Sequence, residues 1–198
     1  RGQSRGQSGG QPLFQEGIPL NIDLPLHYVR IWCYDNSEFN LLSYYWCSSL
    51  NAGVPYFQGY GILPVQLMSL MFMFSKLIAF KLVLVIIYFT APLAALYFFW
   101  RTERYLEAAF AYSFLLLEHG GWHNGGFEQI FLVGMYTNAM GSGLAILSVA
   151  LLINFLEKPT NKSMIWLSLA NTALFLTHII PFALLTLYAL LIFIIYYK

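Results

Sequence analysis

Apolar residues fall into long runs from residue 61 onward, whereas the residues before it mix polar, aromatic and turn-forming side chains. A membrane-spanning helix needs roughly 20 apolar residues, and several of the runs approach or exceed that length. No stretch alternates apolar and polar residues for long enough to predict a strand. The pattern therefore predicts an all-α integral membrane protein, a polytopic bundle of about five spans. The predicted helices are Leu77–Trp100, Tyr105–Leu117, Ile130–Leu156, Met164–Thr177 and Phe182–Tyr197.

Features inside and between the runs refine this prediction. Ile62–Phe74 is apolar but, at about 13 residues, short for a span, so we expect a re-entrant or interfacial helix there. Pro92 predicts a kink within the first long run rather than its end. His178 and Pro181 predict a break between two antiparallel helices. Three glycines in the third long run are expected to allow close helix packing: Gly134, Gly141 and Gly143.

The chain divides into three regions by composition. Residues 1–19 begin with the low-complexity stretch RGQSRGQSGG and are expected to form a flexible N-terminus. Residues 20–60 are expected to form a loop region with short helices on the non-cytoplasmic side, and residues 61–198 the transmembrane bundle. Because the chain starts without Met and its last apolar run reaches its final residues, we expect the bundle to be truncated at both ends.

Composition and charge narrow the class of protein. The chain is 59% hydrophobic and only 10% charged, whereas an average soluble domain has about 25% charged residues. A formal net charge of +1 argues against a nucleic-acid binder. With the exceptions of Lys76 and Lys81, the basic residues of the bundle follow alternate runs. One side of the membrane therefore collects them and is predicted to be cytoplasmic. They are Arg101, Arg104, Lys158, Lys162 and Lys198.

The opposite, non-cytoplasmic side is predicted to hold all four histidines and most of the acids. Within it, residues 23–30 read D-x-P-x-H-x-x-R. Pro25 favours a first helical position, which places Asp23 or Leu24 near the helix N-cap, and His27 and Arg30 on one face. One interpretation is a carboxylate for general-base or metal duty beside anion-binding neighbours. The alternative is a capping Asp beside two interfacial side chains.

Two further segments on that side carry candidate ligands. The loop EHGGWHNGGFE at 118–128 places His119 and His123 four residues apart, a zinc spacing only if the loop is helical. Its glycines disfavour a helix, so a loop whose Trp122 closes over a substrate fits better, with a plain connecting loop as the alternative. The aromatic, glycine-rich stretch 53–61 includes Tyr60, which could stack on a sugar or sit in an interfacial belt. Cys33 and Cys47 are equally compatible with a disulfide and with free thiols.

Three strings together carry a family resemblance. They are D-x-P-x-H-x-x-R at 23–30, A-G-x-P-x-F-x-x-Y-G-x-L-P at 52–64, and L-T-H at 176–178. From about residue 20 to its end, the chain resembles the prokaryotic 6-pyruvoyl-tetrahydropterin synthase-related membrane domain family. More distantly, its layout is similar to that of the GT-C glycosyltransferases.

The resemblance implies a glycosyltransferase in a prokaryotic plasma membrane, with a polyprenyl-phosphate-linked sugar as donor on the non-cytoplasmic side. It implies catalytic roles for Asp23 and Glu128, with Asp23 also the ligand of a divalent metal, Mg²⁺ or Mn²⁺. His27 and Arg30 would contact the donor phosphate. The remaining substrate-binding candidates are His119, His123, Trp122 and Tyr60.

Two other classes remain open from the sequence. A transporter needs ionisable groups at mid-membrane depth, and only Lys81 and Glu107 approach that position. A non-catalytic scaffold subunit predicts that the outward acids diverge in space, whereas an enzyme predicts that Asp23, His27 and Glu128 converge.

Overall fold

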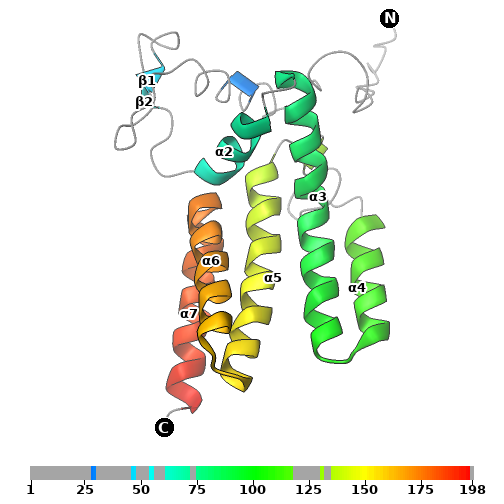
Figure 1. The fold of residues 1–198 in the computed structure, drawn as a ribbon, viewed down its shortest axis with the longest axis vertical. Coiled ribbons are helices and arrows are strands. Elements are labelled where there is room, and N and C mark those ends of the chain that lie inside the picture. Colours follow the sequence, from blue (N-terminus) through cyan, green and yellow to red (C-terminus); the bar gives the residue numbers. More distant parts are fainter. Residues whose placement is uncertain are drawn as a thin grey trace, which may run out of the picture.

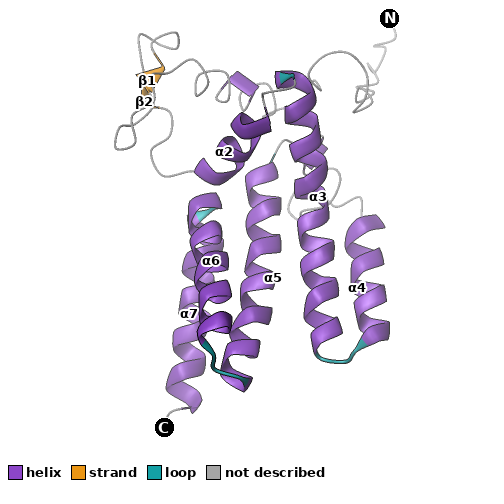
Figure 2. Cartoon of the chain, viewed as in Figure 1, coloured by secondary structure: helices purple, strands orange, loops and turns teal. Residues whose placement is uncertain are grey.

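The computed structural model describes residues 28–29, 46–47, 54–55, 61–71, 75–117, 130–131 and 135–196. These residues form helices joined by short turns, together with two antiparallel two-residue strands, β1 (Trp46–Cys47) and β2 (Val54–Pro55), in which Trp46 lies opposite Pro55. Figures 1 and 2 show the helices, which form a bundle with one short helix across its end. They are α2 (Ile62–Met71), α3 (Lys76–Arg101), α4 (Tyr105–Leu117), α5 (Tyr136–Glu157), α6 (Asn161–Thr177) and α7 (Ile179–Tyr196).

Helix α3 is the centre of the packing, with α4 on one side and α5 on the other, and α6 packs on the far side of α5. Helix α2 lies across the upper end of the bundle in Figure 1 and contacts α3 and α6. The turns at 102–104 and 158–160 both lie at the lower end, as does the end of α7. Arg101, Arg104, Lys158 and Lys162 therefore gather at one end of the bundle. We call this the basic end, and the other the α2 end.

Two of the described helices are long and apolar enough to cross a membrane. They are Leu77–Arg101, with mean hydropathy 2.3, and Tyr136–Glu157, with mean hydropathy 2.0. Two shorter apolar helices, Tyr105–Leu117 and Ile179–Leu191, accompany them. Large hydrophobic side chains are exposed on them, including Leu106 (85% exposed) and Phe110 (73%). Exposed apolar surface of this kind suits contact with lipid better than contact with water. The structure thus confirms the prediction of a helical protein that has apolar helices long enough to cross a membrane.

Several predicted boundaries are corrected by the local chemistry. Helix α6 begins at Asn161, not Met164, because Thr160 and Ser163 form a capping box: Thr160 Oγ1 accepts the Ser163 N–H at 3.1 Å, and Ser163 Oγ accepts the Thr160 N–H at 3.0 Å. Helix α7 begins at Ile179, not Phe182, because Pro181 fits a first helical turn, where its missing N–H is not needed. The predicted break is confirmed, at His178.

The helix formed by the third long run also begins later than predicted. Helix α5 begins at Tyr136 rather than Ile130, with Met135 at its N-cap. Pro92 lies inside α3 without ending it, as predicted. The described residues bury their main hydrophobic cluster between α2, α3 and the first turns of α5, near the α2 end. Phe80, Met68 and Tyr136 are fully buried there.

Gly143 sets the closest approach of α3 and α5. A Cβ added to it would lie 2.8 Å from the Ala91 backbone nitrogen and 2.8 Å from Thr90 Oγ1. No side chain larger than hydrogen fits without moving backbone, so the two helices cross where the small-residue prediction placed a contact. Gly141 likewise faces the turn between α6 and α7, with the Cβ position 3.0 Å from His178 Cβ.

Candidate functional site

The predicted site residues lie in three segments outside the described residues. Each of these segments is next to described residues in the chain. Their arrangement therefore stays a prediction, as does the pairing of Cys33 with Cys47. The residues in question are Asp23, His27, Arg30, Tyr60, His119, Trp122, His123 and Glu128. What the structure places is the described residue next to each segment, and these neighbours limit where the segments attach.

The segment at residues 23–30 is anchored on α3. The Tyr28 ring packs edge-on against the Phe80 ring, with centroids 5.5 Å apart and an interplanar angle of 84°. Such an arrangement is the favoured geometry for an aromatic pair. Phe80 is fully buried, and Tyr28 packs on the hydrophobic cluster to which Phe80 belongs. His27 precedes this anchor by one residue, and Arg30 follows it by two.

The glycine-rich segment is anchored on the same helix. Ile130 and Phe131, two and three residues after Glu128, are 1% and 6% exposed. The Phe131 ring lies 5.8 Å from the Tyr88 ring. The Tyr88 hydroxyl also donates a hydrogen bond to the Leu116 carbonyl near the end of α4, just before residue 118. Both ends of the segment are therefore held close to Tyr88.

These two anchors are close in space. Phe80 and Tyr88 are eight residues apart in one helix, which corresponds to about 12 Å along its axis. The third segment ends at Gly61, which has a positive φ of 68° and whose added Cβ would lie 3.0 Å from Thr137 Cγ2. Phe80 and Gly61 lie toward the α2 end, whereas Tyr88 lies near the midpoint of α3, about 18 Å along the axis from Lys76 and about 20 Å from Arg101. The three segments thus attach along the part of the bundle that runs from the α2 end to its middle.

His178 is a buried histidine between α6 and α7, toward the α2 end. It is 6% exposed and caps α6, with its N–H donating to the Leu174 carbonyl at 2.9 Å. Its Nδ1 accepts the Ile180 N–H at 3.3 Å, which requires a neutral imidazole at that nitrogen. Burial lowers the pKa of His178 below its ordinary value, because desolvation disfavours the charged form.

This environment predicts a pH-dependent stability. A histidine whose pKa is lower in the folded state stabilises the protein above the ordinary pKa of about 6.5 and loses that contribution as pH falls. We expect the thermal midpoint in detergent to fall between about pH 7.5 and pH 5, on either side of that pKa. In His178→Asn, which keeps an acceptor but does not titrate, the fall should be smaller. Equal falls in both proteins would show that His178 is not responsible.

The described residues contain no group of three or more His, Cys, Asp or Glu side chains that could hold a metal ion. The predicted metal ligand, Asp23, lies outside them.

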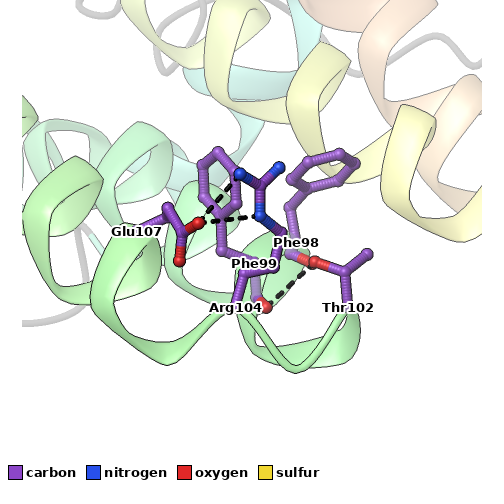
Figure 3. Close-up of polar contacts among 5 residues, drawn as sticks. All are labelled: Phe98, Phe99, Thr102, Arg104 and Glu107. Carbon is purple, nitrogen blue, oxygen red and sulfur yellow. Dashed lines mark hydrogen bonds and ion pairs between the residues drawn. The ribbon is translucent and has the colours of Figure 1, made fainter.

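A second polar feature, at the basic end, was not predicted from the sequence. Figure 3 shows Arg104 held between Glu107 and the Phe99 ring. Arg104 Nη2 and Nε lie 2.8 and 2.9 Å from Glu107 Oε1, and the guanidinium carbon is 5.9 Å from the Phe99 centroid. Thr102 Oγ1 donates to the Phe99 carbonyl at 3.0 Å and caps α3. The Arg-x-x-Glu spacing was the available sequence signal.

This pair stands at one end of an apolar groove of about 710 Å³ between α3, α4 and α5. Phe99 and Ala95 line it from α3, Phe110 and Ala111 from α4, and Ile146 from α5. Its contributing residues are up to about 50 positions apart in the chain, so sequence periodicity could not reveal it.

The chain was compared with family models, with curated proteins and with solved structures. No family model matches the chain, and no curated protein or solved structure does.

Proposed function

We propose that the chain belongs to a GT-C-like polytopic membrane protein of about five spans. Its proposed activity is transfer of a sugar from a polyprenyl-phosphate donor to an acceptor on the non-cytoplasmic side. The observation that supports this proposal is the anchoring of Tyr28 and Phe131 on one helix, because it tethers the segments carrying Asp23 and Glu128 to rings about 12 Å apart along α3.

The orientation follows from the charges. Cytoplasmic loops carry an excess of Lys and Arg, and the turns at 102–104 and 158–160 lie together at the basic end. With that end in the cytoplasm, the three anchored segments face the other side. The sugar of an outer-leaflet lipid phosphate would meet them there.

The proposed reaction is an inverting displacement. Asp23 takes the proton of the acceptor hydroxyl, whose oxygen attacks the anomeric carbon of the sugar. The bond from that carbon to the donor phosphate oxygen breaks, and the phosphate leaves with the bonding electrons. Arg30 and His27 stabilise the negative charge that develops on it. Glu128 is the second carboxylate, and residues 118–128 close over the sugar with His119, Trp122 and His123.

A transporter is less well supported by the two helices of spanning length. Polar pathways through a membrane use ionisable groups at mid-depth. Between Lys81 and Arg101 α3 carries no Asp, Glu, Lys or Arg, and α5 carries none before Glu157.

The test is a transfer assay on the whole chain in proteoliposomes. Radiolabelled polyprenyl-phosphate hexoses (glucose, mannose and galactose in separate samples) are incorporated with an acceptor extract from a prokaryotic cell envelope. Protein-dependent release of polyprenyl phosphate, with label in the acceptor fraction, is the expected result. Release no faster than in protein-free liposomes with all three donors would contradict the proposal.

A further inference from the structure

The apolar groove at the basic end has a shape and position suited to a lipid chain. Its walls come from three helices, and the Phe110 and Phe114 rings stack along the α4 side, 6.0 Å apart with an interplanar angle of 17°. Phe110 is 73% exposed and Phe114 53% exposed. At about 710 Å³ the groove is within the size range of ligand sites, roughly 300–1,000 Å³.

The polar end of the groove is the Arg104–Glu107 ion pair, in which the carboxylate offsets the charge of the guanidinium. The ion pair with Glu107 uses the Nε–H and an Nη2–H of Arg104, two of the five N–H donors that a guanidinium has. Packing of Phe99 against the guanidinium holds its orientation. Arg104 is 59% exposed, so its other donors can reach a ligand. A planar guanidinium matches phosphate geometry and recognises it in preference to uncharged oxygen.

The depth of Arg104 in the bilayer agrees with a phosphate ligand. Helix α3 has 26 residues and is about 39 Å long, which exceeds the roughly 30 Å hydrocarbon core. Trp100 and Tyr105 flank the turn, both more than half exposed and in edge-on contact at 5.0 Å. Exposed Trp and Tyr are typical of the membrane interface, so the turn lies at the level of lipid headgroups.

We propose that this groove binds a membrane phospholipid, with an acyl chain between α3, α4 and α5 and the phosphate on Arg104. Complementarity supports this occupant: an apolar groove leads directly, at headgroup depth, to a fixed guanidinium that has N–H donors beyond the two used by Glu107. The site lies at the opposite end of the bundle from the proposed transfer site, and it does not depend on that function.

The test is native mass spectrometry of the whole chain in detergent, with phosphatidylglycerol and with diacylglycerol carrying the same acyl chains. We expect the phospholipid to bind better, by at most about fivefold, since one basic residue near the headgroups contributes that factor and Glu107 offsets part of it. Arg104→Gln should remove this preference. Lys162→Gln, which removes an exposed positive charge at the same end but outside the groove, should retain it.

A second pair of variants tests the acyl chain. Ala111 lines the groove, whereas Ala109 is exposed on the same helix and does not. Ala111→Trp should reduce binding of both lipids, and Ala109→Trp should leave it unchanged. Equal binding of the two lipids by the wild-type chain would overturn the proposal. Equal losses of phospholipid preference in Arg104→Gln and Lys162→Gln would also overturn it. A dimer that Ala111→Trp dissociates would overturn it as well, because the occupant of the groove would then be a second copy of the chain.

Discussion

Asp23→Asn is expected to reduce sugar transfer in proteoliposomes by about 10² to 10⁴-fold. An amide cannot take the proton of the acceptor hydroxyl at neutral pH, although it nearly preserves the size and shape of the carboxylate. Transfer is measured as the initial rate of label appearing in the acceptor, at saturating donor. The loss should fall on kcat, because Asp23 acts on the attacking oxygen rather than on donor binding.

The matched control is Asp35→Asn, the other aspartate of the N-terminal region. It removes the same charge and should keep nearly the full rate. Both variants should elute and melt like the wild-type chain, because an amide nearly preserves the size and shape of the carboxylate that it replaces. If Asp23→Asn transferred sugar at the wild-type rate, the role given to Asp23 would be wrong.

Gly143→Leu is expected to destabilise the bundle strongly. Even a single added carbon would lie 2.8 Å from the Ala91 nitrogen and 2.9 Å from the Thr90 carbonyl carbon, both backbone atoms. Relieving that contact means separating α3 and α5, the most extensive helix pair in the described structure. Overpacking a core costs about 1–3 kcal/mol, and the upper part of that range applies to leucine. For a chain of this length, 3 kcal/mol lowers the thermal midpoint by about 6–12 °C.

The control is Ser142→Leu, at the adjacent residue of α5, where the side chain is exposed. It introduces the same hydrophobic group and loses only the hydrogen bond from Ser142 Oγ to the Asn138 carbonyl. The thermal midpoint is measured in detergent by loss of monodisperse protein. Similar midpoints for the two variants would show that Gly143 does not set the helix approach.

The ends of a helix could be predicted from the sequence where charged residues flank an apolar run. Tyr105–Leu117 matches α4 at both ends, and Leu77–Trp100 differs from α3 by one residue at each end. The errors fall at helix starts, where an apolar run does not mark the first helical residue: α5 begins at Tyr136 although the apolar run begins at Ile130. Thr160 and Ser163 were predicted to lie in a loop, because capping depends on hydrogen bonds rather than on hydrophobicity. Pro181 read as a break, although proline is well tolerated in a first turn.

The candidate site was predictable only in part. Candidate residues could be chosen by chemical type, but nothing in the sequence indicated that Tyr28 and Phe131 pack two turns apart on one helix. That proximity arises from tertiary packing between residues about 100 positions apart, which a pattern of local periodicity does not contain. The Arg104 groove was missed for the same reason.

The central claim is that the segments carrying Asp23 and Glu128 lie close together, attached to α3 between Phe80 and Tyr88. A distance measurement between spin labels at Leu26→Cys and Phe127→Cys, with Cys33 and Cys47 replaced by serine, tests it most directly. Phe80 and Tyr88 lie about 12 Å apart along α3. The labelled positions are only two residues from Tyr28 and four from Phe131, so we expect a mean distance below about 25 Å between the labels. A control pair at Leu26→Cys and Lys158→Cys spans the bundle and should exceed about 33 Å, the length of α5. A 26–127 distance as long as that of the control pair would contradict the account.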